Sequence, residues 1–168
     1  MNNKETIKIV VPGKDKGDFA SYAPVVSQWT YAEPGMSPRS VEKLLGYFKE
    51  GRSVLLFDAS NGSLLAHAAI KWVSVKNPLL EVGSVIVNPD ERGKGYGAVA
   101  VLAAWELAKA EYPDYVKFAF CNAASLGIFK KLGAVEAQAG QLPQEVLQGS
   151  LVDVDTLVIL PKSGPKKI

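Results

Sequence analysis

A glycine-rich turn between two apolar runs constrains this chain more than any other feature of its sequence. The first run, residues 82–87, is short and rich in β-branched side chains, as is typical of a strand. The second run, residues 98–105, is rich in alanine and leucine and apolar on every side, which favours a buried helix. Asn88-Pro89 and the segment R-G-K-G-Y-G at residues 92–97 lie between them. The sequence therefore predicts a strand, a tight turn and a buried helix in succession.

This turn has the features of an anion-binding site. The first amides of a helix have no partner within it, and the macrodipole adds about half a positive charge at that end. Gly93, Gly95 and Gly97 let the backbone approach a ligand, while Arg92 and Lys94 add full charges. A phosphate-bearing ligand fits such a turn, although glycines that only shape a tight turn are the alternative. The spacing matches neither the nucleotide P-loop nor the dinucleotide fingerprint.

The turn resembles a known signature. Arg92, Gly95 and Gly97 match Arg/Gln-x-x-Gly-x-Gly/Ala of the GNAT superfamily of acetyl-CoA-dependent N-acetyltransferases. The resemblance implies that the pyrophosphate of coenzyme A is held by Arg92, Gly93, Lys94, Gly95, Tyr96, Gly97 and Ala98. It further implies that the pantetheine arm runs along Val85, Ile86 and Val87, with a backbone amide near Val85 facing the reacting carbonyl. A strand spans about 13 Å from residue 87 to residue 83, room for most of the extended arm.

A second stretch, N-A-A-S-L-G-I-F-K-K-L-G-A at residues 122–134, resembles the family motif N-x-x-A-x-x-x-Y-x-K-x-G-F. Through this resemblance Asn122, Ser125 and Phe129 are expected beside the coenzyme. Phe129 stands where many members carry a tyrosine that protonates the departing thiolate. Because phenylalanine has no proton to give, that step needs Ser125, Cys121 or solvent instead. A thiolate with a pKa of about 8.5 is a fair leaving group even without an acid.

Glu81 is the candidate general base. It precedes Arg92 by eleven residues, and a glutamate at that distance is the base in several family members. An acceptor amine with a pKa of about 10.4 is almost wholly protonated at pH 7 and must lose a proton before it attacks. Alternation puts Glu81 and Val85 on one face of a regular strand, whereas a bulge at Gly83-Ser84 would turn a backbone amide toward the ligand. An ordinary solvated glutamate at a strand end is the alternative.

Other polar residues carry weaker signals. Glu33 follows two aromatic residues in an expected loop and would attract a cationic amine or simply pack at a rim. His67, the lone histidine, lies between alanines and reads as structural. No cluster of histidine, cysteine and carboxylate side chains has ligand spacing, so no metal is expected. Cys121 is the lone cysteine, and the first residues lack a signal-peptide core, so we expect a cytoplasmic protein.

The order of expected elements predicts the fold class. Strands and helices alternate as strand, two helices, three strands, helix, strand, helix and two strands, which is also the order of the GNAT fold. We predict an α/β, GNAT-like fold with a mixed, mostly antiparallel central sheet of about seven strands flanked by about four helices. At 168 residues one domain, residues 1–160, is expected, followed by a basic, loose tail at 161–168. Ser37-Pro38 is predicted to start the second helix.

The expected activity is transfer of an acetyl group from acetyl-CoA, as cosubstrate, to a primary amine of a small molecule or amino acid. Attack would be direct, within a ternary complex. The net charge of +2 gives no reason to expect a nucleic-acid partner. The sequence has no uncharged apolar stretch of 18 residues, so a membrane partner is not expected either. The acceptor, the acyl length and a homodimer stay open. Two alternatives are an acyl-CoA-binding domain with reduced catalysis, which Phe129 favours, and a domain that binds ATP at the turn.

Overall fold

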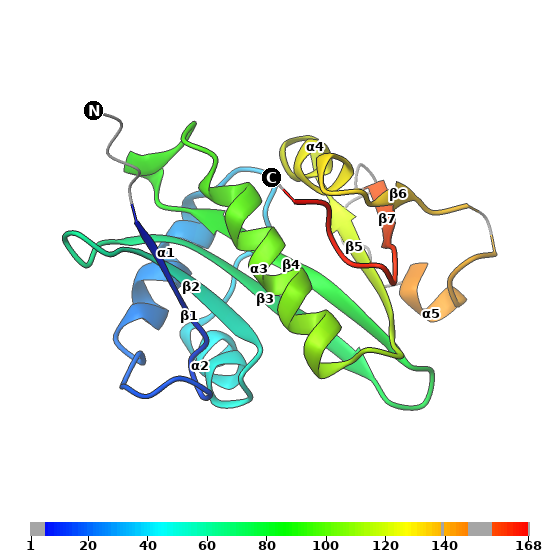
Figure 1. Cartoon of the computed structure of the whole chain (residues 1–168), viewed down its shortest axis with the longest axis horizontal. Coiled ribbons are helices and arrows are strands. Elements are labelled where there is room, and N and C mark those ends of the chain that lie inside the picture. Colours follow the sequence, from blue (N-terminus) through cyan, green and yellow to red (C-terminus); the bar gives the residue numbers. More distant parts are fainter. Residues whose placement is uncertain (1–5, 139, 148–155, 168) are drawn as a thin grey trace.

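The protein is built on one sheet of seven strands in the order β1-β2-β3-β4-β5-β7-β6 (Figure 1). A computed structural model describes residues 6–138, 140–147 and 156–167. The strands are β1 (Ile7–Val10), β2 (Ser53–Asp58), β3 (Leu64–Ser74), β4 (Leu79–Val87), β5 (Val116–Cys121), β6 (Val135–Glu136) and β7 (Thr156–Leu160). The helices are α1 (Tyr22–Ala32), α2 (Val41–Lys49), α3 (Tyr96–Glu111), α4 (Ala123–Lys131) and α5 (Gln144–Leu147), with a 3-10 turn η1 (Pro89–Glu91). The predicted fold class, a mixed and mostly antiparallel α/β sheet, is confirmed.

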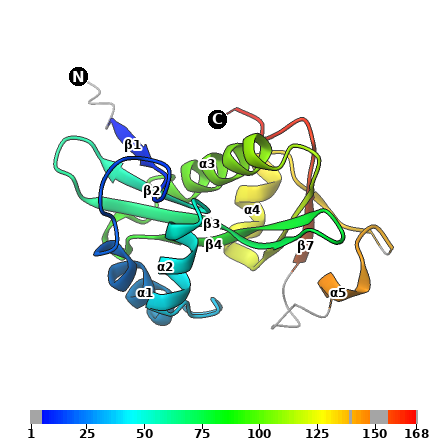
Figure 2. The same cartoon turned by 90° about the horizontal axis from the view of Figure 1, so that it is seen from below.

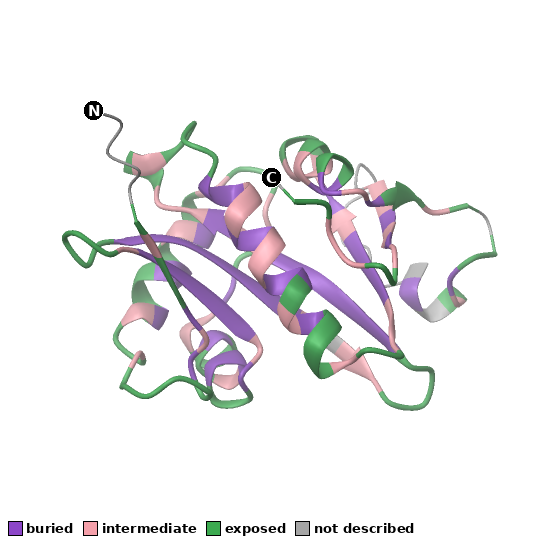
Figure 3. Ribbon diagram, in the orientation of Figure 1, coloured by how far each residue is buried: buried purple, intermediate pink, exposed green. Residues whose placement is uncertain are grey.

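Helices cover both faces of this sheet, as Figure 2 shows for α1 and α2 on one side and α3 on the other. The face under α3 holds one core, which includes Leu80, Val82 and Trp105. The opposite face holds a second core under α1 and α2, which includes Phe48 and Ile86. The central strands are therefore buried along most of their length, while the loops at their ends are exposed (Figure 3).

The parallel pair β4 and β5 separates partway along its length. Their register begins at Leu79 opposite Val116 and ends at Glu81 opposite Phe118. In the part of the chain that the structure describes, β4 has no further register partner on the β5 side beyond Glu81. The backbone of β4 up to Val87 therefore borders an opening between the two strands rather than a continuous sheet.

The second helix begins later than we predicted. Ser40, not Ser37, is the N-cap of α2, and its hydroxyl accepts a hydrogen bond from the amide of Lys43 at 3.2 Å. The reason lies in α1, whose Thr30 hydroxyl accepts the Arg39 amide at 2.9 Å and whose Ser27 hydroxyl donates to the Arg39 carbonyl at 2.7 Å. These bonds use both backbone groups of Arg39 and hold the preceding residues outside the helix.

The C-terminal segment makes contacts that the sequence did not suggest when we predicted a loose tail. The Lys166 amide donates to the Leu132 carbonyl, just after α4, at 2.8 Å. The Lys109 ammonium of α3 donates to the Ser163 carbonyl at 3.2 Å. Residues 161–167 therefore touch both α3 and the end of α4. No helix among the described residues has the length and apolar character needed to cross a membrane.

Candidate functional site

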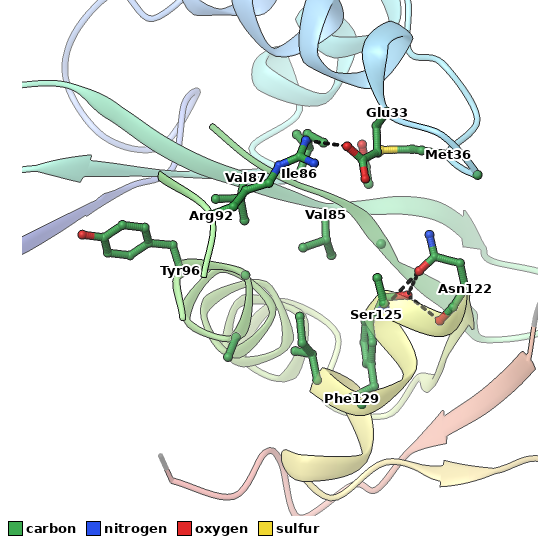
Figure 4. A pocket seen from close by; sticks show the side chains of 18 of the residues that line it. Glu33, Met36, Val85, Ile86, Val87, Arg92, Tyr96, Asn122, Ser125 and Phe129 are labelled. Atoms are coloured by element: carbon green, nitrogen blue, oxygen red, sulfur yellow. Dashed lines mark hydrogen bonds and ion pairs between the residues drawn. The ribbon is translucent and has the colours of Figure 1, made fainter. Parts of the chain in front are cut away.

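A cavity of about 580 Å³ lies at the opening between β4 and β5. Its walls come from the α1–α2 loop, β3, β4, the turn before α3, the end of β5 and α4 (Figure 4). The predicted site residues that line it are Val85, Ile86, Val87, Arg92, Gly93, Gly95, Tyr96, Gly97, Ala98, Asn122, Ser125 and Phe129. The fold thus brings the two sequence motifs, which are about thirty residues apart, to a single cavity.

Two predicted residues do not line this cavity. Lys94 lies outside it, and its exposed ammonium pairs with the Glu91 carboxylate at 2.6 Å. Glu81 is separated from the cavity by the side chain of Lys71, whose ammonium pairs with the Glu81 carboxylate at 2.6 Å. Lys71 does line the cavity, so the carboxylate of Glu81 reaches it only past Lys71 and Gly83.

The turn before α3 leaves room for a ligand at its backbone. Gly93 and Gly95 have φ angles of 80° and 88°, a conformation that favours glycine, and no atom lies within 4 Å of where a Cβ would stand on either. Gly95 is the N-cap of α3, so the amides of the first helical turn face the same opening. Gly97 has a different role, because a Cβ there would lie 3.1 Å from Ile128 of α4. These observations fit a ligand with a diphosphate group.

A bulge in β4 changes which side chains face the cavity, as the sequence suggested at Gly83-Ser84. Gly83 is opposite Ala69 and Ile86 is opposite His67, so β4 has one extra residue over this interval. Ser84 has a φ of 52°, in the left-handed region. The bulge reverses the alternation, so Val85 packs toward the α3 core whereas Ile86 packs under α1 and α2.

His67 holds this bulge in place from the neighbouring strand. Its Nδ1 lies 2.9 Å from the Ser84 carbonyl oxygen, and its Nε2 lies 2.9 Å from the Ser53 hydroxyl. Since a carbonyl only accepts, Nδ1 carries the proton and Nε2 accepts from Ser53. Complete burial lowers the pKa of His67 to about 4, although its bond to Ser84 opposes this shift. The sequence indicated a structural histidine but not this bond, which joins residues on different strands.

The Lys71–Glu81 pair was not visible in the sequence. The register between β3 and β4 shifts between Ile70 and Trp72, which makes Lys71 the extra residue of β3. The Lys71 side chain then crosses the position above Gly83, where a Cβ would lie 2.9 Å from its Cδ. A side chain at residue 83 would therefore force Lys71 to shift from this path to Glu81. No local pattern marks Lys71, because the contact depends on the irregular pairing of two strands.

The opposite wall of the cavity carries a separate set of charges. Arg92, from the turn, forms an ion pair with Glu33, from the α1–α2 loop (Figure 4). Glu33, which we considered as a site for a cationic amine, is thus already paired. Arg39 also lines this wall, is only 7% exposed and was missed by sequence reasoning. Arg39 lies in a loop that contains no sequence motif, so no pattern pointed to it.

The second motif forms the remaining wall, at the start of α4. Asn122 is the N-cap of α4, and its side-chain oxygen accepts from the Ser125 amide at 2.9 Å and from the Ser125 hydroxyl at 3.1 Å. Phe129 lies one turn further along, buried yet against the cavity. Cys121 is buried in the α3-side core and is not a lining residue. Of the two proton donors considered from the sequence, only Ser125 therefore borders the cavity.

Comparisons with known proteins bear on the fold and the family of this chain. "UPF0039 protein C11D3.02c" of Schizosaccharomyces pombe is 36% identical over 64 residues, which are 38% of this chain and 41% of that protein. N-acetylglutamate synthase from Neisseria gonorrhoeae, solved with coenzyme A and L-arginine, superposes with a TM-score of 0.67 at 16% identity, over 91% of this chain and 32% of the synthase. A spermidine N-acetyltransferase, a chimera of SpeG from Vibrio cholerae and hSSAT, gives a TM-score of 0.64 at 12% identity, over 94% of this chain and 96% of the chimera.

These two likenesses to solved structures concern the fold, and the chain spans less than half of the yeast protein and about a third of the synthase. The family itself follows from the sequence. Residues 24–134, about two-thirds of the chain, match the acetyltransferase (GNAT) family. That interval contains both motifs, the bulged strand and every residue placed around the cavity. The chain therefore belongs to the GNAT family of acetyltransferases.

Proposed function

We propose that the protein transfers an acetyl group from acetyl-CoA to the primary amine of a small molecule or amino acid, by direct attack within a ternary complex. The observation that carries the proposal is the single cavity, bounded by the glycine turn on one side and by the bulged, unpaired edge of β4 on the other. A bound coenzyme with its diphosphate at the turn and its arm along this edge would present its thioester near Gly83.

The residues of the chain then have distinct roles. Arg92 and the first amides of α3 hold the diphosphate, with Lys131, which also lines the cavity, as a further cation. The backbone at the bulge donates to the acyl oxygen as negative charge develops there. His67 positions that backbone through its bond to Ser84.

Glu81 is the proposed base. It accepts a proton from the acceptor ammonium, through water because Lys71 and Gly83 lie between it and the cavity. The amine nitrogen then forms a bond to the acyl carbon while the carbon–sulfur bond breaks and the electron pair leaves on sulfur. The nitrogen loses its second proton to solvent as the amide forms. The thiolate takes a proton from solvent or from Ser125, because Phe129 has none to give.

The direct test is release of thiol from acetyl-CoA across a panel of amino acids, polyamines, aminoglycosides and peptides, with the acetylated product identified by mass. Turnover with at least one class of amine supports the proposal. Tight binding of acetyl-CoA without turnover on any amine would contradict it and favour the second candidate, an acyl-CoA-binding domain with reduced catalysis. Phe129, buried at the position of the family tyrosine, is the observation that favours this candidate.

A further inference from the structure

Arg39 is a buried cation in the cavity wall. Its residue is 7% exposed, and its Nε is buried without a hydrogen-bond partner. Its Nη1 donates to the carbonyls of Ser37 and Pro38, at 3.0 and 3.3 Å, which leaves the guanidinium edge with Nε unused. No carboxylate among the described residues forms an ion pair with it.

The position of Arg39 is fixed before any ligand arrives. Both of its backbone groups bond to the buried hydroxyls of Ser27 and Thr30 in α1. Its side chain is then held by the two loop carbonyls that precede it. A guanidinium held in this way loses little freedom when it binds a planar anion in two-point contact.

Arg52 provides an internal comparison. Its Nη1 also donates to two backbone carbonyls, those of Ile70 and Lys71, and its Nε is also buried without a partner. However, Arg52 pairs with the Glu50 carboxylate at 2.6 Å and does not line the cavity. Among the described residues, Arg52 and the cavity-lining Arg92 each pair with a carboxylate, whereas Arg39 pairs with none.

The two carboxylates that the structure describes near the cavity already form ion pairs with other cations. Glu33 pairs with Arg92, and Glu81 pairs with Lys71. The charge of Arg39 also reaches the neighbouring Lys43, since after burial it is the main cause that lowers the pKa of that ammonium. Because a buried charge is costly unless it is paired, this part of the cavity calls for an anion from the ligand.

The anion is not expected to come from the coenzyme. Arg39 lies at the start of α2, which packs on the sheet face opposite α3, whereas the diphosphate site lies at the N-terminus of α3. We propose that the acceptor is an amine that carries a carboxylate, which the guanidinium of Arg39 binds while the amine lies toward Gly83 and Lys71. This inference rests on the proposed function and narrows its acceptor to amino-acid-like amines.

Matched amines that differ by one carboxylate test the inference. We would compare L-lysine with cadaverine and L-phenylalanine with phenethylamine, and add O-phosphoethanolamine with ethanolamine to separate carboxylate from phosphate. The carboxylated member of each pair is expected to have a kcat/KM about 10- to 100-fold higher, as for a hydrogen-bonded charge pair. Equal rates within the carboxylate pairs, or a larger effect of the phosphate, would overturn the assignment.

Variants locate the effect. Arg39→Gln is expected to reduce the ratio within each pair to near one, and Arg39→Lys to restore part of it. Arg52→Gln is the matched control and should keep the full ratio of kcat/KM within each pair. A loss of folded protein lowers the apparent kcat/KM of both substrates by the same factor, so it leaves their ratio unchanged. An unchanged ratio in Arg39→Gln would contradict the proposal.

A binding measurement keeps this test separate from the proposed function. Calorimetry of the same amines with the protein saturated in coenzyme A needs no turnover. Binding of the carboxylated members that Arg39→Gln abolishes would support the inference even if no amine is acetylated. Acetylation of amines together with equal binding of both members would leave the acetyltransferase proposal intact and refute the carboxylate site.

Discussion

The two halves of the cavity differ in the groups that line them: backbone in one half and side chains in the other. The half at the start of α3 is made largely of backbone, with the turn glycines at positive φ and the bulged strand β4. The half at the α1–α2 loop is made of side chains, Glu33 and Arg39 from that loop and Lys71 from β3. A backbone site needs particular residues at fixed spacing, so it leaves a motif in the sequence. A side-chain site needs only the right groups to meet in space, so it leaves none.

This contrast suggests a division of function. The backbone half suits a ligand that every family member shares, while the side-chain half suits a ligand that differs between members. Substitutions in one half should then leave the other half's binding unchanged. Two of the four experiments below, on Glu81 and Gly95, test this separation, and the other two examine the backbone half alone; they start with the largest expected effect.

Replacing Glu81 by glutamine should lower kcat by about 10²- to 10⁴-fold, the usual contribution of a general base. The dissociation constant of acetyl-CoA should not change, since Glu81 lies outside the coenzyme half. Stopped-flow thiol release and calorimetry would measure the two quantities. Glu136→Gln removes a carboxylate from an exposed pair with Lys130 and serves as the control. A rate equal to that of the unsubstituted protein would remove Glu81 from the role of base.

Replacing Gly95 by valine should weaken coenzyme A binding by about 100-fold or more. The new side chain would occupy the open space at the turn, and a β-branched residue is strained at a φ of 88°. Gly62→Val is the matched control, because Gly62 has a φ of 76° and open space too but lies between β2 and β3, away from the cavity. Calorimetry that finds normal affinity in Gly95→Val, with Gly62→Val equally folded, would refute the diphosphate site.

Replacing His67 by glutamine should flatten part of the pH dependence of stability. The pKa of His67 falls from 6.5 to about 4 on folding, so the unfolded chain binds the extra proton between these values. Its contribution is therefore complete above pH 6.5 and is lost as the pH falls through 4, about 3 kcal/mol in all. Urea unfolding at pH 7 and pH 4.5 should show this difference between the two proteins. The same decline in both would show that His67 is not buried in its neutral form.

Replacing Phe129 by tyrosine should have the smallest effect, an increase in kcat of less than about tenfold. The added hydroxyl would border the cavity one helical turn from Ser125, but the thiolate already leaves well at neutral pH. A pH–rate profile would show whether a new acidic limb appears. An increase of about 100-fold would instead show that protonation of the thiolate limits the reaction in the unsubstituted protein.

Much of the fold could be predicted from sequence because its signals are local. The strand predicted at residues 82–87 lies within β4, and the bulge lies close to Gly83-Ser84, where the sequence offered one as an alternative to a regular strand. The start of α2 was wrong because Ser37-Pro38 satisfied a local rule, while bonds from α1 to Arg39 decided the outcome. Lys71 and Arg39 were missed for a related reason. The role of Lys71 depends on strand register, and the role of Arg39 depends on the absence of an anionic partner among the described residues. Neither property can be inferred from the residues next to them in the sequence.

The contacts of residues 161–167 have a practical consequence. The Lys166 amide braces the chain just after α4, and Gly164 packs against Lys109, within about one turn of the end of α3. Both helices that frame the backbone half are thus anchored by the same few residues. A version shortened to residue 160 would free both helix ends at once. Purification handles fused to this end of the chain should therefore be removed before coenzyme affinities are compared.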